Sequence, residues 1–392
     1  MSDLLRQSVN GQPPSEQSLR PKPTPIPVQQ GQPTTETDDY PSSDSSASSA
    51  ATIDTIRPSS REQQAPPTHW TNYFDQELYL EEEKEDQKAI YHVYLTPPTD
   101  PKKGPLFICH HGAGASAMSF AVFAQKIRKK LPEAGILSLS ARGHGSHITS
   151  TTDGSEVIDY SLSALTSDAL SMITLTSASQ SWPTLPPTIL IGHSLGGAIM
   201  TTIAATHFKA LGPSLIGYSV IDVVEGSAIE ALSHMRTYLS SRPSLFSSLD
   251  EAIQWHIRTR TIRDPASAEA SVPSLLLPSP TGNGKYIWRT DLQSTSAWWQ
   301  EWFQAMSSKF LIGRGAKMLI LAGTDRLDRE LMIGQMQGKF QLTVIPEAGH
   351  FVQEDVPEKA AALHAEFFRR NDRSQMVLPP KVSDLIAQGK KV

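Results

Sequence analysis

The stretch Thr188-Ile-Leu-Ile-Gly-His-Ser194-Leu-Gly196 decides the fold, because it puts a G-x-S-x-G pentapeptide between an apolar run and a run of small residues. Residues 188–191 have the fully apolar character of a buried parallel strand, and residues 197–205 that of a helix packed closely on a sheet. Glycines flanking a serine permit the strained turn that lifts its hydroxyl above the sheet. The pattern predicts that Ser194 is a nucleophile rather than a serine that only caps a helix.

On both sides of this stretch, short β-like runs alternate with longer helix-like runs. The expected strands are 91–95, 106–110, 135–140, 216–221, 317–322 and 342–345, and the expected helices are 119–130, 161–174 and 358–368. Such alternation is typical of βαβ units. We therefore expect an α/β fold with a mostly parallel central sheet and helices on both faces.

Composition divides the chain into three parts. Residues 1–67 hold 11 of the 29 prolines and few large apolar side chains, which predicts a disordered tail, either solvated or carrying a linear partner-binding segment. Residues 371–392 are expected to be a flexible C-terminal tail. The remaining residues, 68–370, are expected to form one catalytic domain, with a lid or insert at about 225–310.

Charge and cysteine content exclude several classes of protein. The 392 residues include 35 Lys and Arg against 40 Asp and Glu, a net charge of −5, which disfavours nucleic acid as a partner. The single cysteine, Cys109, excludes an intramolecular disulfide and a cysteine-rich zinc site, and is expected to be a small buried residue. Without an apolar leader or membrane-spanning run, we expect a cytoplasmic protein with no membrane partner; nuclear entry is left open.

The loop His110-His111-Gly112-Ala113-Gly114 follows an expected strand and is suited to binding a developing oxyanion. In this architecture one donor is the N–H after the nucleophile, here Leu195, and the other comes from this loop, where Ala113 is the expected donor. A phosphate-binding loop is disfavoured because the Lys-Ser/Thr pair of a P-loop is missing. The two histidines are expected to shape the loop rather than to act as bases.

His350 is the expected general base. It follows Gly349 after the expected strand 342–345, and it comes last in the chain order serine, acid, histidine. The other histidines have no comparable position; this group includes His144, His193, His234, His256 and His364. His193, within the serine motif, is expected to serve in packing.

The acid that orients His350 has more than one candidate. Asp325 and Asp328 follow the expected strand 317–322, whereas Asp222 ends the expected strand 216–221, one crossover after Ser194. Position along the chain slightly favours Asp325 or Asp328, but it leaves the choice open.

Four longer motifs carry a resemblance to a known family. The stretches Gly192-His-Ser-Leu-Gly-Gly-Ala-Ile199, Ile221-Asp-Val-Val-Glu-Gly226, Tyr286-Ile-Trp-Arg289, and 322–328 with 333–340, resemble the protein phosphatase methylesterase family over roughly residues 68–370. Members of that family are α/β-hydrolases that remove the methyl ester from the C-terminal leucine of the type 2A protein phosphatase catalytic subunit.

The resemblance assigns roles to individual residues. It implies Ser194 as nucleophile, Asp222 as acid and His350 as base, with no metal or organic cofactor, and a monomer whose partner is that phosphatase subunit. Asp325 and Asp328 then become structural, in a charge-paired loop with Arg326 and Arg329. The rival functions are a general carboxylesterase or lipase of the same fold and a phosphatase-binding inhibitory protein.

Two segments of the lid region carry further expectations. The tryptophan-rich segment 298–303 is expected to pack into a lid helix, with a partner-docking surface as the alternative. The Pro/Gly-rich segment 271–285 is expected to be a mobile loop.

Overall fold

The computed structural model describes residues 69–84, 86–323 and 327–372, all within one compact unit. The expected N-terminal tail 1–67 lies outside these residues, as do 373–392. Asp325 and Arg326 lie outside them too, so the structure says nothing of these two side chains.

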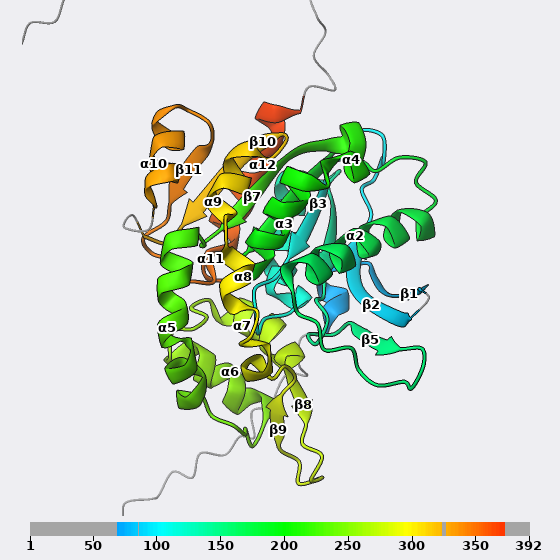
Figure 1. The fold of residues 1–392 in the computed structure, drawn as a ribbon, viewed down its shortest axis with the longest axis vertical. Helices are drawn as coiled ribbons and strands as arrows, with labels where there is room; N and C mark the ends of the chain where they lie inside the picture. Colours follow the sequence, from blue (N-terminus) through cyan, green and yellow to red (C-terminus); the bar gives the residue numbers. More distant parts are fainter. Residues whose placement is uncertain (1–68, 85, 324–326, 373–392) are drawn as a thin grey trace, which may run out of the picture. The chain divides into compact units, whose positions relative to one another are not determined.

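A single mixed sheet forms the centre of the molecule, and its mostly parallel strands confirm the expected α/β architecture (Figure 1). The spatial order is β1-β2-β4-β3-β6-β7-β10-β11, with β5 also paired to β2. Strands β4, β3, β6, β7, β10 and β11 run parallel, whereas β1, β2 and β5 are antiparallel to their neighbours. The bounds are β1 Gln76–Glu83, β2 Gln87–Thr96, β3 Leu106–His110, β4 Gly135–Leu139, β5 His147–Ser150, β6 Thr188–His193, β7 Leu215–Ile221, β10 Ala316–Leu321 and β11 Gln341–Val344.

Helices cover both faces of this sheet, because the central strands are apolar on both sides. On β3, Ile108 packs with helices α2 (Leu162–Ser179) and α3 (Leu195–Thr206), while Phe107 and Cys109 face α1 (Ala121–Lys130) and α12 (Pro357–Asn371). Cys109 is fully buried, and burial raises the pKa of its thiol well above the usual range. Helix α12 extends to Asn371, beyond the expected helix end at 368.

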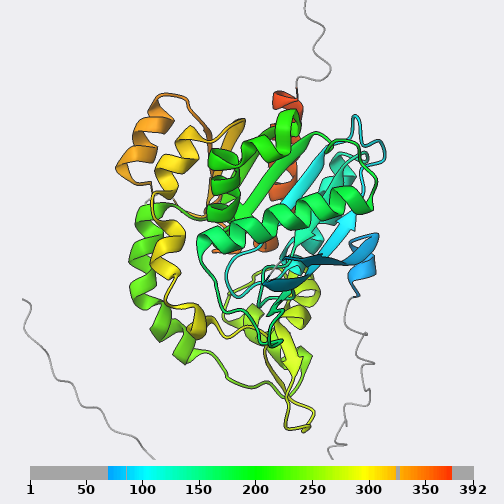
Figure 2. The same ribbon diagram turned by 45° about the vertical axis from the view of Figure 1, so that its right-hand side comes forward.

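The chain between β7 and β10 forms a mostly helical insert beside the sheet (Figure 2). It contains α5 Glu225–Ser241, α6 Leu249–Arg258, α7 Pro265–Ser271, the hairpin of β8 Leu276–Pro278 with β9 Tyr286–Trp288, α8 Trp299–Phe303 and α9 Met306–Ile312. A separate apolar cluster, including Phe246, Ile253 and Val272, holds its outer part together. Segment 271–285, expected as a loop, instead includes a 3-10 turn and the first strand of the hairpin.

The tryptophan-rich segment packs inward. Trp299 and Trp302 are buried; the indole N–H of Trp302 donates to the carbonyl of Tyr160 at 2.7 Å, and that of Trp299 to the Thr295 hydroxyl at 2.8 Å. Both rings therefore belong to the contact between insert and sheet domain, in line with the core-packing interpretation. In the described part of the chain, no helix is long and apolar enough to cross a membrane.

Candidate active site

Ser194 occupies a strained turn between β6 and α3. Its backbone has φ 51° and ψ −119°, a conformation that L-residues rarely adopt, and its N–H donates to the carbonyl of Ile221 at 3.0 Å. The hydroxyl makes no capping bond to α3, which removes the helix-cap alternative. The turn lies so close to the end of β3 that position 196 must be glycine. A Cβ there would lie 2.2 Å from the carbonyl oxygen of His110.

The structure brings His350 and Asp222 together. Nδ1 of His350 donates to Oδ2 of Asp222 at 2.8 Å, and the other carboxylate oxygen accepts from the N–H of Ala322 at 2.8 Å. The Asp222 carboxylate is fully buried, whereas the His350 side chain is 46% exposed. This bond fixes the tautomer and leaves Nε2 of His350 available as a base, and His350 lines the same cavity as Ser194.

Asp328 has a different role from the one that its position in the chain suggested. Its carboxylate caps helix α10 (Arg329–Met336) by accepting from the N–H of Leu331 at 2.9 Å, and it accepts from the Ser307 hydroxyl at 2.5 Å. The expected charge-paired loop is therefore corrected at this residue: Asp328 binds a helix end and a hydroxyl. Of the two described acid candidates, only Asp222 contacts His350.

The two expected oxyanion donors are Ala113, in the loop after β3, and Leu195, the first residue of α3. Gly112 and Ala113 line the cavity with Ser194. Among residues 69–84, 86–323 and 327–372, neither the N–H of Ala113 nor that of Leu195 has a hydrogen-bond acceptor. Both donors are thus free for a ligand, which is common for Leu195 because it is the first residue of a helix.

Buried histidines shape this loop. His111 donates through Nδ1 to the carbonyl of Gly112 at 2.8 Å and accepts through Nε2 from the N–H of Ala141 at 3.0 Å. His144 accepts through Nε2 from the N–H of Gly114 at 2.9 Å and donates through Nδ1 to the carbonyl of Arg142 at 2.9 Å. Burial lowers the pKa of His144 to about 4 and that of His111 well below its usual range, so both rings are neutral at neutral pH.

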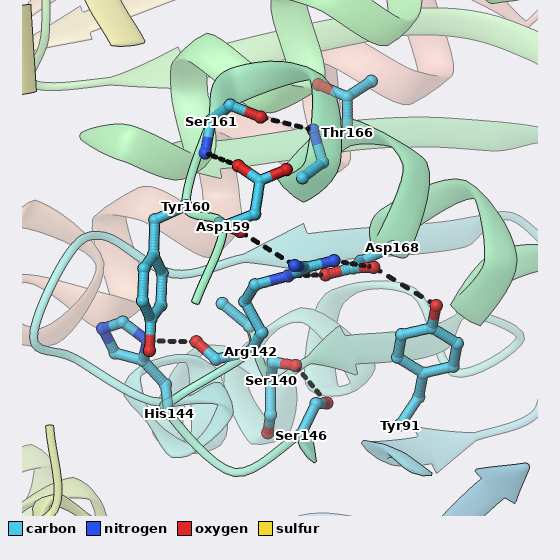
Figure 3. A network of polar contacts seen from close by, with 12 residues as sticks. Tyr91, Ser140, Arg142, His144, Ser146, Asp159, Tyr160, Ser161, Thr166 and Asp168 are labelled. Atoms are coloured by element: carbon cyan, nitrogen blue, oxygen red, sulfur yellow. Dashed lines mark hydrogen bonds and ion pairs between the residues drawn. The ribbon is translucent and has the colours of Figure 1, made fainter. Parts of the chain in front are cut away.

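A buried ion pair holds the turn that carries His144 (Figure 3). The guanidinium of Arg142 forms two bonds to the Asp168 carboxylate, at 2.5 and 2.7 Å, and a third to the carbonyl of Asp159 at 2.8 Å. Tyr91 donates its hydroxyl to the same carboxylate at 3.2 Å. Sequence reasoning missed this pair and the role of His144, although the glycine-spaced Arg142-Gly-His-Gly145 after β4 was a usable signal.

His193 does more than pack. Its Nε2 donates to the carbonyl of His350 at 2.9 Å, and the two rings lie 4.7 Å apart. Burial lowers the pKa of His193 to about 3, which keeps the ring neutral beside His350. The serine turn and the loop that carries the candidate base are thereby tied together.

A cavity of about 740 Å³ opens at these residues, between sheet domain and insert. Its wall is largely apolar, with Leu232, Met235, Leu292 and Phe303 among the lining residues. Glu354 also lines it; burial raises its pKa to about 8. Its two oxygens accept from the hydroxyls of Ser119 and Ser271, each at 2.5 Å. Sequence reasoning did not single out this carboxyl group.

Within the described residues, no group of three or more His, Cys, Asp or Glu side chains could hold a metal ion. The functional groups at the cavity floor are those of acyl transfer: a serine on a strained turn, a histidine held by a buried carboxylate, and free backbone N–H donors.

Comparisons with known proteins show the family of the chain. Residues 107–363 match the family model described as alpha/beta hydrolase family. A relative from Neurospora crassa, named protein phosphatase methylesterase 1, is 52% identical over 370 residues and covers 83% of this chain and 80% of its own. The relative of that name from Schizosaccharomyces pombe is 46% identical over 314 residues, with 80% and 87% covered.

Solved structures share the fold at low sequence identity. E-2-(acetamidomethylene)succinate hydrolase superposes with a TM-score of 0.54 at 17% identity, covering 75% of this chain and 100% of that one. A peroxisomal alpha-beta-hydrolase from Saccharomyces cerevisiae also has a TM-score of 0.54, at 15% identity, with 80% and 94% covered. The fold, the family model and the close fungal relatives lead to one conclusion: the chain belongs to the protein phosphatase methylesterase family of alpha/beta hydrolases and is a carboxylic ester hydrolase.

Proposed function

We propose that this protein removes the methyl ester from the C-terminal leucine of the type 2A protein phosphatase catalytic subunit, with Ser194, His350 and Asp222 as its catalytic triad. The observation that carries the proposal is the 2.8 Å bond from His350 to the buried Asp222 carboxylate, at a cavity that also contains the strained Ser194. Since a protein of this family acts on a phosphatase by name, the substrate is expected to be a polypeptide chain end.

The reaction proceeds in two stages. In the first, Ser194 Oγ attacks the ester carbonyl while Nε2 of His350 takes the hydroxyl proton, and the N–H groups of Ala113 and Leu195 bind the oxyanion. The C–O bond to the methoxy group breaks, and methanol leaves with the proton from His350. In the second, His350 deprotonates a water that attacks the acyl-serine, which releases the leucine carboxylate and restores Ser194.

Cavity chemistry supports a leucine ester as substrate. The apolar wall, with Leu232, Met235 and Phe303, suits an aliphatic side chain, and nothing in the two-stage reaction calls for a cofactor.

The test uses the carboxymethylated phosphatase catalytic subunit. The unmodified protein should release its methyl group as methanol, and Ser194→Ala should lower this rate by at least about 10³-fold while retaining the fold. Undiminished demethylation by Ser194→Ala would refute the triad. Turnover of long-chain or small acyl esters with no preference for the phosphatase would indicate a general esterase, and binding of the phosphatase without any turnover by the unmodified protein would indicate an inhibitory protein.

A further inference from the structure

Helix α5 lines the cavity along its whole length. The lining positions recur every three or four residues and include Ala228, Ala231, Met235 and Tyr238, with Arg242 just past the helix end. None of its 17 residues is fully buried. Although Ala228, Leu232 and Met235 also pack against the main apolar core, this face of a long helix stays open to the cavity, as expected of a helix that contacts a ligand.

Arg242 has an unusual environment at the far end of this face. Its guanidinium carbon lies 4.4 Å from the ring centre of Trp288 and 5.9 Å from that of Tyr238. The Trp288 indole is itself fixed, since its N–H donates to the carbonyl of Pro243 at 2.7 Å. Stacking of this kind holds the guanidinium in place and leaves its in-plane N–H groups free to bind an anion.

In the described residues, no carboxylate forms an ion pair with Arg242, although the charge of Asp291 acts on it from beyond ion-pair distance. The Nε of Arg242 is buried without a hydrogen-bond partner, and burial lowers the pKa of the group, although a guanidinium keeps its charge. The buried acids of the cavity are already engaged, Asp222 with His350 and Glu354 with two serine hydroxyls. Glu230, on the same helix, lies 12 residues away, a rise of about 18 Å.

A second cation, the exposed Arg260, also lines the cavity, and its charge acts on Asp355, which accepts from the N–H of Gly349. The partly buried guanidinium of Arg242, whose Nε has no hydrogen-bond partner, is costly to leave unpaired. The arrangement is therefore expected to be stabilised by an anion that arrives with the substrate.

We propose that Arg242, supported by Trp288, forms a subsite for an acidic side chain of the substrate polypeptide upstream of the methyl-esterified residue. This inference rests on the proposed function, since it assumes a polypeptide substrate at Ser194. Helix α5 begins three residues after Asp222 and rises about 25 Å over its length, so an extended chain of up to about seven residues spans the distance to Arg242.

The test measures binding separately from chemistry. Fluorescent decapeptide leucine methyl esters carry one Glu, or Gln as its uncharged equivalent, at successive positions before the leucine. Their affinities for the full-length Ser194→Ala protein are read by anisotropy. At one position Glu should bind about 10- to 100-fold more tightly than Gln, the range of a charge-assisted hydrogen bond, and Arg242→Gln in the same background should abolish this preference.

Two controls make the outcome decisive. Arg236→Gln, an exposed position of α5 away from the cavity lining, should leave the Glu preference unchanged. Glu binding that persists in Arg242→Gln, absence of a preference at every position, or absence of peptide binding would each overturn the subsite. A phosphoserine peptide that binds more than tenfold more tightly than the Glu peptide would replace the carboxylate with a phosphate as the occupant.

Turnover of the same peptides by the unmodified protein tests the proposed function independently. A protein that hydrolyses the methyl esters but shows no Arg242-dependent preference refutes the subsite alone. A protein that binds the Glu peptide through Arg242 yet hydrolyses neither these esters nor the methylated phosphatase refutes the proposed function alone.

Discussion

Asp222 and Asp328 have similar chemistry and different environments. Asp222 is buried against His350, whereas Asp328 caps helix α10. We expect Asp222→Asn to lower the esterase rate constant by about 10³- to 10⁴-fold with little loss of stability, because the amide cannot hold the required histidine tautomer.

Asp328→Asn is the matched control. Asparagine caps helices nearly as well as aspartate. The esterase rate of this variant should therefore stay within about twofold of the unmodified protein, and its unfolding free energy within roughly 1 kcal/mol. Steady-state kinetics and urea unfolding measure both effects. Equal losses of activity in the two variants would contradict the assignment of the acid.

The sequence alone could predict Ser194 and His350 as candidates but not choose the acid, for a geometric reason. Strands β7 and β10 are parallel neighbours, so their carboxyl ends meet at one edge of the sheet. The N–H of Asp222 bonds to the carbonyl of Ile320, which shows how close the two strand ends lie. Spacing along the chain does not separate such neighbours; the family motif, and then the side-chain contacts, favour Asp222.

At the scale of elements, the serine turn depends on close backbone contact. An added Cβ at Gly196 would lie 2.2 Å from a backbone carbonyl oxygen that cannot easily move, so Gly196→Ala should distort the turn and lower both activity and thermal stability. At Gly226, in the first turn of α5, the nearest atom would be 3.5 Å away. Gly226→Ala should therefore leave activity unchanged and leave stability unchanged or slightly higher. Thermal unfolding and ester turnover compare the two variants. Similar melting temperatures for Gly196→Ala and Gly226→Ala would contradict this account of the turn.

The Arg142–Asp168 pair makes a prediction about the turn with His144 (Figure 3). Both side chains are about 95% buried, so Asp168→Ala leaves a guanidinium without a partner and should cost about 3–5 kcal/mol of unfolding free energy. Urea unfolding measures this loss. The exposed pair of Lys359 and Glu347 provides the comparison, since Glu347→Ala should cost far less than Asp168→Ala. Equal costs would show that burial does not decide the energy.

The strands that sequence analysis did not predict are β1, β5, β8 and β9, which lie outside the apolar centre of the sheet. Strand β1 reads QELYLEEE and has one buried residue, Leu80, so it lacks the apolar alternation by which strands are found. Strand β5, HITS, is short and largely polar, and β8 and β9 have three residues each, too few to show an alternation. The central strands were predicted within one or two residues for most of their ends because burial on both faces makes them continuously apolar.

For the whole molecule, buried neutral histidines govern stability in acid. Burial lowers the pKa of His110, His144, His256 and His364 to about 4. The unfolded chain binds protons at these histidines near pH 6.5, and the folded chain does not. The stability that these neutral rings contribute is therefore fully present above that pH and is lost as the pH falls from about 6.5 toward 4.

His364 offers a direct test of this linkage. It is fully buried, its Nε2 has no hydrogen-bond partner, and its ring lies edge-on to Phe123. In His364→Leu, the loss of unfolding free energy between pH 7.5 and pH 5 should be about 1–2 kcal/mol smaller than in the unmodified protein. Urea unfolding at the two pH values checks this, with exposed His69→Gln as control; an unchanged pH dependence in His364→Leu would argue against a neutral buried ring.

The single buried Cys109 also has a practical consequence. Its thiol is inaccessible in β3 and its raised pKa disfavours the reactive thiolate, so thiol-directed reagents should find no target among the described residues of the folded protein. A cysteine introduced at an exposed position such as Ile229 of α5 would then be the one labelled site. A dye placed there would report movements of the insert during substrate binding without any need to remove a native cysteine first.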